Sequence, residues 1–561
     1  MAVSYLIFVF ALGIVVFGIR LVQRRRFYAD LVAANGIHPP RVKPKPPHSP
    51  IWGHLKLFNE IISQFPPNTA IATYYTEISH KYNLKGIFYL DLWPFGPSQM
   101  ILVHPDAAEQ VTTIENYPLH DVVARYLTPL IGENAIGAAD GEKWKMLHQI
   151  LAPSFRPSNV KAAAPVIAEQ VCKLLRPALE AYAARTGTGG GEIFSMEKCA
   201  AQLVFGISSM VILGDGVSEE ENAHLLQCLD HIVDYATTLT LTTAVNPLVK
   251  AGKWWKKRTA TRHMDLFLQG FVKNRYAQIA EGKISRGRMM NLTMLDTLLF
   301  NARGVQCEPH DQTTLKPEFL QIVVDNLKGL LLGGFGTTAD TLCYVFIMVA
   351  LHPAVVQNLR EEHNQVFGSD SNLTKTILQQ SPHKLNELVY TTAVIKETLR
   401  LFPVGFGVRK AKPGTTTLTY NHTLYPTVGQ MIIPCTHTIH YDADAFAHPT
   451  KFDPARFLDL DDLDSGAAAK VPREAWRPFE RGARACPGRE LAMDEMRIIL
   501  LLTVRDFDFQ CAGVDSEPSS TTRAHHTDMD LVMGDLAFQE TGFSAKARGG
   551  TMMRVSSAVR L

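Results

Sequence analysis

The sequence predicts a mainly α-helical fold with small β-sheets, placed behind a single N-terminal transmembrane helix. An apolar run near the N-terminus, followed by a proline-rich stretch, predicts the anchor and its linker. Apolar residues then recur at helical spacing in many long segments after residue 70, with only short strand-like pieces between them. No proline- or serine-rich linker interrupts residues 51–561, so we expect them to form one large domain.

The N-terminal segment is expected to anchor the chain in a membrane. Residues 2–19 are an apolar run of 18 residues, and a helix needs about 17–25 such residues to cross a bilayer. Arginines at 24, 25 and 26 follow the run, whereas a cleaved signal peptide carries its positive charge before a shorter apolar core. Because arginine clusters beside a membrane helix stay in the cytosol, we expect residues 1–26 to be an uncleaved anchor with the rest of the chain cytosolic.

Residues 27–50 are expected to be a semi-rigid linker between the anchor and the domain formed by residues 51–561. Six of the twelve residues from 39 to 50 are proline, which cannot continue a helix and stiffens the chain. Such a spacer fixes how the main domain sits on the membrane.

Helical periodicity in the main domain is broken by a few short β-like segments. Helices are expected at residues 69–82, 140–150, 160–184, 196–213, 219–240, 262–281, 318–350, 353–366, 385–401 and 488–504, and strands at 86–91, 99–103, 416–420, 430–433, 505–509 and within 536–554. The glycine-rich residues 187–191 are interpreted as a surface loop, because no strand leads into them and Glu192 stands where a dinucleotide-binding motif has its third glycine. The sequence therefore has no evident flavin or nicotinamide site.

Charge and cysteine content exclude several classes of protein. The chain has 56 basic and 54 acidic residues, a net charge of +2, so we expect no nucleic-acid partner. Eight cysteines without a Cys-x-x-Cys pair form neither a disulfide framework nor a zinc-finger spacing. The default interpretation is a reducing compartment with buried thiols.

One cysteine stands apart from the rest. Cys486 ends a glycine-containing loop directly before a predicted helix, and Arg481 and Arg484 flank it. Helix-start amides and arginines are expected to lower the thiol pKa and favour a thiolate. A nucleophilic cysteine needs a histidine base, which nothing nearby supplies, so a thiolate bound to iron fits the segment better.

Residues 479–488 (Phe-Glu-Arg-Gly-Ala-Arg-Ala-Cys-Pro-Gly) resemble the haem-binding signature Phe-x-x-Gly-x-Arg-x-Cys-x-Gly of the cytochrome P450 family at every fixed position. The resemblance implies a P450 fold over residues 51–561 that holds haem b. Cys486 would be the axial iron ligand, and Phe479, Arg484 and Gly488 would belong to the cofactor-binding segment.

Two further segments match the family in its order along the chain. Glu397 and Arg400, at spacing i, i+3 on one helix face, look like its Glu-x-x-Arg pair. Arg456, in Phe-Asp-Pro-Ala-Arg-Phe, matches the later arginine that joins the pair. The resemblance gives these three residues a structural role behind the haem, because buried charges persist only when they are fully paired.

The helix expected at 318–350 contains three glycines within residues 333–336, each costing about 1 kcal/mol relative to alanine. Close packing or room for a ligand would explain them. The resemblance places this helix across the distal haem face and gives Thr337 and Thr338 proton-handling, catalytic roles. Gly336 departs from the pattern, because the family usually has an acid there; Asp340, one turn on, could replace it but points further along the helix.

Haem propionates are expected to be bound by three segments. Trp144 and His148 match the family's Trp-x-x-x-Arg pair, with histidine in place of arginine. Arg409 aligns with another propionate arginine, and Arg484 is the third residue of this kind.

The resemblance implies a membrane-anchored monooxygenase of the microsomal type, single-pass in the endoplasmic reticulum membrane. It would insert one atom of O₂ into a lipophilic substrate, with electrons from NADPH through a separate NADPH–cytochrome P450 reductase and cytochrome b5 as a further candidate partner. One alternative is a haem-thiolate isomerase or dehydratase that acts on a peroxide without a reductase, motivated by Gly336. Another is a haem-bound carrier or gas sensor without turnover.

The substrate is only weakly encoded. By the family's layout the pocket is lined near residues 113–135, 230–245, 325–337, 402–409 and 540–546. The chain looks similar to filamentous-fungal members that tailor polyketides, terpenoids or alkaloids, so a secondary metabolite is the expected substrate. Hydroxylation of a fatty acid or alkane is the second expectation.

Overall fold

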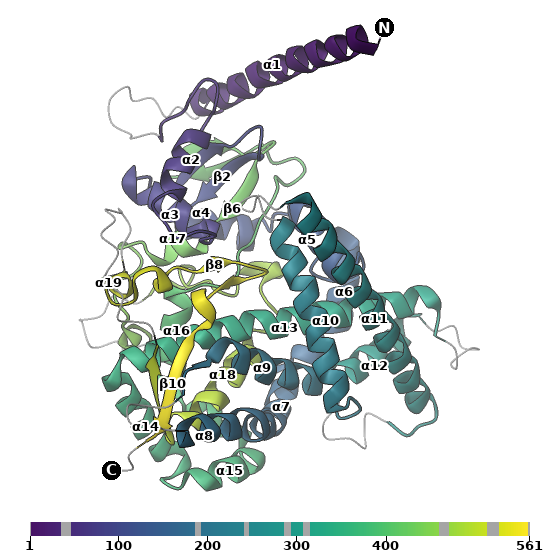
Figure 1. Ribbon diagram of the computed structural model, residues 1–561, viewed down its shortest axis with the longest axis vertical. Coiled ribbons are helices and arrows are strands. Elements are labelled where there is room, and N and C mark those ends of the chain that lie inside the picture. Colours follow the sequence, from purple (N-terminus) through teal and green to yellow (C-terminus); the bar gives the residue numbers. More distant parts are fainter. Residues whose placement is uncertain are drawn as a thin grey trace.

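The computed structural model describes residues 2–34, 46–185, 192–239, 246–284, 293–306, 315–458, 471–512 and 527–558. A largely helical body carries small sheets, and one long helix projects from it (Figure 1). This confirms the expected mainly α fold with small β-sheets. The glycine-rich residues 187–191 and residues 35–45, which include part of the proline-rich stretch, lie outside the described ranges.

Most of the described chain is helix, and the helices are α1 (Ala2–Ala34), α2 (Leu55–Ile62), α3 (Ile71–Lys81), α4 (Pro105–Glu109), α5 (Asp121–Ile131), α6 (Gly141–Leu151), α7 (Pro157–Gln170), α8 (Arg176–Ala184), α9 (Met196–Ile212), α10 (Glu219–Ala236), α11 (Pro247–Ala280), α12 (Met294–Gln306), α13 (Pro317–Leu351), α14 (Pro353–Phe367), α15 (Thr374–Gln380), α16 (Val389–Leu401), α17 (Thr436–His440), α18 (Arg489–Thr503) and α19 (Asp528–Met533). Short 3-10 or π turns are η1 (Gln110–Ile114), η2 (Ala152–Phe155), η3 (Val171–Leu175), η4 (Thr237–Leu239), η5 (Ser371–Leu373), η6 (Pro382–Glu387), η7 (Pro454–Phe457), η8 (Gly482–Arg484), η9 (Gly534–Ala537) and η10 (Arg548–Gly550).

The described strands are β1 (Ile87–Asp91), β2 (Ser98–Leu102), β3 (Phe194–Ser195), β4 (Thr417–Tyr420), β5 (Thr423–Pro426), β6 (Met431–Pro434), β7 (Phe507–Cys511), β8 (Glu540–Thr541), β9 (Ala545–Lys546) and β10 (Met552–Ser557). They form two three-stranded sheets, β1-β2-β6 and β3-β10-β7, and two hairpins, β4-β5 and β8-β9. Strand β2 is antiparallel to β1, with Met100 opposite Tyr89, and parallel to β6, with Met100 opposite Ile432. The β8-β9 hairpin lies beside α13, where the site is built.

Helix α13 runs through the body and packs against α9, α11, α16 and α18 (Figure 1). It is apolar almost all round, which is typical of a helix buried in a large core. Two described helices are long and apolar enough to span a membrane, and α13 is one of them, but 72% of its apolar window is buried inside the protein. Its apolarity therefore reflects the core.

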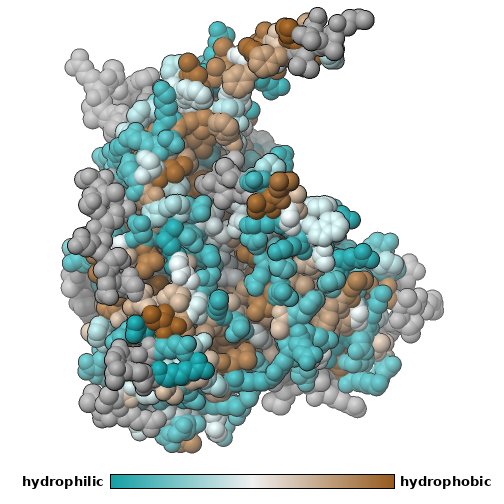
Figure 2. All heavy atoms as spheres, viewed as in Figure 1, coloured by the Kyte–Doolittle hydropathy of each residue, from teal (hydrophilic) through white to brown (hydrophobic). Residues whose placement is uncertain are grey.

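The second candidate span lies in α1, at Ile7–Val32, and none of its apolar window is buried. The helix stands clear of the body, and its side chains form an apolar projection (Figure 2). The helix continues to Ala34, so the expected boundary between anchor and linker at residue 26 falls inside it. Arg25 pairs with Asp91 at the end of β1 and donates to the Ile51 carbonyl across 2.7 Å, so the end of α1 rests on the body.

Sequence periodicity located most core helices within a few residues, but it placed the start of α11 too late. Asn246 accepts a hydrogen bond from the Leu248 amide across 2.9 Å, and Pro247 occupies the first turn, so the helix begins at Pro247 instead of residue 262. Its first turns expose Leu248, Trp254 and Trp255, which breaks the pattern of buried apolar residues. The helices that were not expected are α2, α4, α5, α12, α15, α17 and α19; most of them have eight residues or fewer, and α5 contains Pro129.

Candidate active site

The Cys486 segment is a turn that packs under η1 and leads into α18. The Cys486 amide donates to the Phe479 carbonyl across 2.8 Å, which closes the loop, and η8 lies inside it. Gly482 has φ +76°, and a Cβ there would come within 1.8 Å of the Thr112 carbonyl oxygen, so only glycine fits. A Cβ at Gly488 would lie 3.8 Å from the Cys486 sulfur, and glycine there leaves that side of the sulfur open.

The Cys486 thiol is accessible, although the surrounding protein buries much of the group. Among the seven described cysteines it is the exposed one, and yet the protein around it raises its thiol pKa by burial. A thiol can be exposed and also surrounded by protein atoms when it faces a space inside the protein instead of the outer surface. A hydrogen bond from the Gly488 amide acts in the opposite direction and lowers the pKa.

The expectation that the flanking arginines lower this thiol pKa is wrong for the described state. Arg481 donates to the Trp476 carbonyl across 2.9 Å, and Arg484 donates to the Ala139 carbonyl across 3.0 Å. Both guanidinium groups are therefore hydrogen-bonded to backbone carbonyls, and burial has the largest effect on the thiol pKa of Cys486. A bound metal ion would supply the missing stabilisation of a thiolate.

Arg484 joins the cysteine loop to α6. It pairs with Asp140, and its guanidinium carbon lies 4.3 Å from the centre of the Trp144 ring. The Trp144 and His148 rings are 4.9 Å apart, one helical turn from each other, and His148 is exposed. The structure thus places Trp144 beside both His148 and Arg484, and their binding of one anionic ligand stays a prediction.

Arg409 enters the same region from a bridge to β6. Its amide donates to the Ile432 carbonyl across 2.8 Å, and its buried guanidinium lies 3.7 Å from Glu480. Its Nε atom has no hydrogen-bond partner among the described residues. Burial lowers the pKa of Arg484, and the charge of Arg409 adds to this effect, so the two guanidinium groups are close.

Sequence reasoning missed two residues of this cluster. Arg477 is fully buried and donates through Nη2 to the Thr112 hydroxyl across 2.8 Å, while its Nε and Nη1 have no described partner. Glu480, with φ +57°, lies 3.5 Å from Arg477 and is the carboxylate that it shares with Arg409. An arginine inside the apolar Trp-Arg-Pro-Phe run before the cysteine loop was the available signal.

These observations test whether the site fits a haem. Two buried arginines share one carboxylate and keep unpartnered N–H donors, which suits a ligand with its own negative groups. An accessible thiol in a closed loop suits an iron ligand. The residues therefore fit haem, and no cluster of three or more His, Cys, Asp or Glu in the described ranges offers another metal site.

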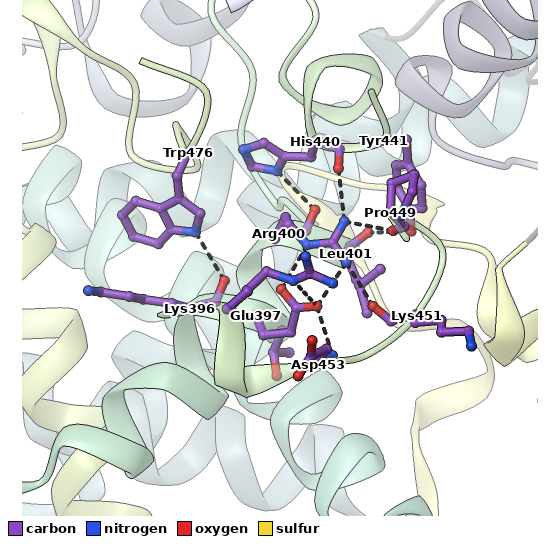
Figure 3. A network of polar contacts seen from close by, with 12 residues as sticks. Lys396, Glu397, Arg400, Leu401, His440, Tyr441, Pro449, Lys451, Asp453 and Trp476 are labelled. Carbon is purple, nitrogen blue, oxygen red and sulfur yellow. Dashed lines mark hydrogen bonds and ion pairs between the residues drawn. The ribbon is translucent and has the colours of Figure 1, made fainter. Parts of the chain in front are cut away.

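Glu397 and Arg400 lie in one buried network of polar contacts (Figure 3), and Arg456 joins it through Glu397. Arg400 binds both oxygens of Glu397, at 2.7 and 2.9 Å, and Arg456 donates to Glu397 across 3.0 Å. Arg400 also donates to the backbone carbonyls of His440 and Pro449. The three residues expected as a structural set are thus in contact, and both oxygens of Glu397 are bonded.

Helix α13 presents Thr337 and Thr338 differently. Thr337 is half-buried and donates to the Gly333 carbonyl across 2.8 Å. Thr338 is buried, and its hydroxyl donates to Glu495 of α18, whose pKa burial raises to about 8. Thr337 therefore lies on the more accessible side of α13, and Thr338 is turned toward α18.

The glycines of α13 include one that allows close helix packing and one that leaves open space beside the backbone. A Cβ at Gly334 would lie 3.1 Å from the Ser208 hydroxyl, so Gly334 allows close packing of α9. Gly333 faces open space, and a Cβ at Gly336 would lie 3.7 Å from the Phe543 ring. Gly333 thus leaves room beside the backbone, whereas the hairpin that carries Phe543 and Ser544 bounds the space beside Gly336.

Known proteins resemble the chain over nearly its whole length. The family model described as Cytochrome P450 matches residues 44–533. The cytochrome P450 monooxygenase acrF of Aspergillus aculeatus is 31% identical over 507 residues, covering 86% of this chain and 96% of the relative. The cytochrome P450 monooxygenase ptmG of Penicillium ochrochloron is 27% identical and covers 98% and 94%, and polC of Polytolypa hystricis is 27% identical and covers 89% and 86%.

Proposed function

The chain belongs to the cytochrome P450 family, and we propose that Cys486 makes it a haem-thiolate monooxygenase of fungal secondary metabolism. The relatives are named monooxygenases, and the chain is an oxygenase of this kind. The observation that supports the assignment of Cys486 is its accessible thiol, which directly precedes α18 in a loop that also carries the buried, under-partnered Arg477.

The proposed overall reaction converts a substrate R–H, O₂, NADPH and a proton into R–OH, water and NADP⁺. Haem b, when bound, supplies the iron at which O₂ is activated, with electron density from the thiolate. Cys486 holds that iron, and Phe479 and Gly488 shape the loop that presents the sulfur. Trp144, His148, Arg409 and Arg484 bind the haem carboxylates, and Glu397, Arg400 and Arg456 support the loop from behind.

Electrons are proposed to come from NADPH through a separate NADPH–cytochrome P450 reductase, with cytochrome b5 as a second donor. The sequence supports this, because it has no glycine-rich dinucleotide motif after a strand. The substrate is proposed to be a lipophilic secondary metabolite, which the fungal relatives support. Fatty-acid or alkane hydroxylation is the second substrate class.

We also propose that α1 anchors the enzyme in the endoplasmic reticulum membrane as a single pass, with residues 51–561 in the cytosol. The exposed, apolar window at Ile7–Val32 supports anchoring. The contact of Arg25 with Asp91 ties the end of this helix to the body.

Product analysis under ¹⁸O₂ tests the function. Membranes that hold the enzyme and a flavin reductase receive candidate lipophilic metabolites, with and without NADPH. The monooxygenase predicts a product that gains one labelled oxygen only with NADPH. An unlabelled product formed equally without NADPH would instead establish the isomerase or dehydratase that Gly336 motivates.

A further inference from the structure

We propose that Ser544 and Asp340 form the proton-donating pair of this active site, with Ser544 filling the place of the acid that Gly336 lacks. The proposal rests on the monooxygenase function above. It assigns residues of two distant segments, the β8-β9 hairpin and α13, to one step of that reaction.

The first observation is where the Ser544 hydroxyl lies. A Cβ built on Gly336 would be 4.0 Å from the Ser544 oxygen and 3.7 Å from the Phe543 ring. The tip of the β8-β9 hairpin therefore occupies the space into which a side chain at position 336 would extend. Ser544 is itself buried, so its hydroxyl is held in a defined place beside α13.

The second observation is the partner of that hydroxyl. Ser544 is hydrogen-bonded to Asp340, which lies one turn after Gly336 on α13. Thr337 and Asp340 are three residues apart and share one face of the helix. The expectation that Asp340 points away along the helix did not take the hairpin into account. The Ser544 hydroxyl, which is bonded to Asp340, lies beside Gly336 and so connects the carboxyl to that position.

The electrostatic surroundings suit Asp340 to proton transfer. Burial raises the pKa of Asp340 to about 7, the nearby charge of Glu197 raises it, and the bond to Ser544 and the charge of Lys546 lower it. Cys343 and Tyr344 lie close on the same helix and stay neutral, because burial raises the pKa of both. A donor is most effective when its pKa is near the working pH.

We propose that reprotonation of Asp340 uses a neighbouring ion pair. Lys546, the last residue of β9, pairs with Glu197 of α9 across 2.9 Å, and both side chains are about one-third exposed. The charges of both residues act on Asp340. A partly exposed pair whose charges reach the carboxyl suits the return of a proton from solvent.

The step balances within the overall reaction. Each turnover uses two electrons from NADPH and two protons to reduce one oxygen atom of O₂ to water. For each proton delivered, the O–H bond of Asp340 breaks and a bond to the Ser544 oxygen forms. The original hydroxyl proton of Ser544 passes to water beside Gly336, and Asp340 then takes a proton from solvent.

The competing explanation is that Asp340 and Ser544 only fasten the hairpin to α13. Asp340→Asn distinguishes the two explanations, because an amide can keep the bond to Ser544 but cannot supply the proton. Ser544→Ala removes the hydroxyl, and Thr541→Ala on the same hairpin is the control, since its hydroxyl bonds the Thr69 carbonyl instead. A Gly336→Asp, Ser544→Ala double variant restores an acid where the Cβ has room.

Two readouts decide between these explanations. In the resting enzyme, infrared difference spectra should show, beside the band of Glu495, a second protonated carboxyl band that titrates near neutral pH, disappears in Asp340→Asn and shifts in Ser544→Ala. During turnover, the fraction of NADPH electrons that reaches product should fall about tenfold or more in both variants, with peroxide rising in proportion. Spectral titration should show unchanged substrate binding, and the double variant should regain coupling.

Several results would overturn the proposal. They are wild-type coupling in Asp340→Asn, a loss of coupling in Thr541→Ala equal to that in Ser544→Ala, or protonated-carboxyl bands that are the same in Asp340→Asn as in the wild type. Failure of the proposed function is recognised separately, because the wild-type enzyme would then form no ¹⁸O-labelled product. Labelled product from the wild type with full coupling in Asp340→Asn would overturn the proton-donating pair alone.

Discussion

The Arg477 amide donates a hydrogen bond to Nε2 of His440 across 3.1 Å, and this contact joins the cysteine segment to the buried ion network behind it. Nδ1 of His440 donates in turn to the Arg400 carbonyl across 2.9 Å. Burial, together with the charge of Arg400, holds the pKa of His440 well below its usual range, so the ring is neutral. The network of Glu397 is thereby coupled to the loop that carries Cys486.

Replacement of His440 tests this coupling. His440→Leu leaves the Arg477 amide and the Arg400 carbonyl buried without partners, at a cost of about 1–3 kcal/mol for each group. We expect a lower thermal unfolding midpoint and less haem per protein. His440→Gln, which can still donate and accept, should recover part of the loss; equal stability of the Leu variant and the wild type would rule the coupling out.

Glu397 is expected to be essential for stability. Glu397→Gln leaves Arg400 and Arg456 buried without a counter-charge, which costs about 3–5 kcal/mol. The measurement is the free energy of unfolding of the haem-loaded enzyme, with haem content beside it. Glu142→Gln is the matched control, because its pair with Lys145 is exposed and should be dispensable. A loss of activity at normal stability and haem content would contradict the structural role.

Arg409 is expected to increase the affinity of the protein for haem. Arg409→Met removes a buried guanidinium whose Nε lacks a protein partner. A hydrogen bond to a charged group contributes about 1.5–3 kcal/mol, so haem affinity should fall about ten- to a hundredfold. Haem release to a scavenging protein measures this effect. Lys410→Met removes the neighbouring charge, which pairs with Asp121 at the surface, and should release haem like the wild type.

Glu495 should make stability depend on pH. Burial raises its pKa to about 8, so the folded state binds this proton more tightly than the unfolded state does. Protonated Glu495 stabilises the folded state fully when the pH is below the pKa that this carboxyl has in the unfolded chain. This stabilisation is lost as the pH rises toward about 8, by at most about 1.4 kcal/mol per pH unit. Glu495→Gln should flatten the fall in unfolding midpoint between about pH 6 and about pH 8. Glu490→Gln, on the exposed face of α18, should leave the fall as it is, and an unchanged slope in Glu495→Gln would refute the assignment.

Local signals account for what the sequence predicted well. Helix α14 begins at Pro353 and ends before Gly368, and α10 begins with a capping box between Ser218 and Glu221, so their bounds follow from neighbouring residues. The Phe479–Gly488 spacing predicted a loop directly before α18 for the same reason, and the bond from the Cys486 amide to the Phe479 carbonyl closes that loop.

Long-range contacts explain what the sequence did not predict. Arg477 meets Thr112 across 365 residues and Asp340 meets Ser544 across 204, and no local pattern links the members of either pair. The raised thiol pKa of Cys486 depends on burial and on where Arg481 and Arg484 point, which only the folded chain decides. These features arise from tertiary packing.

X-ray absorption at the iron edge of the purified, haem-loaded enzyme tests the central claim most directly. The account predicts one sulfur scatterer bound to iron in the wild type, its absence in Cys486→Ser and its retention in Cys172→Ser, which alters a half-buried cysteine elsewhere. Sulfur bound to iron in Cys486→Ser, or none in the wild type, would contradict the assignment of Cys486 as the thiolate ligand.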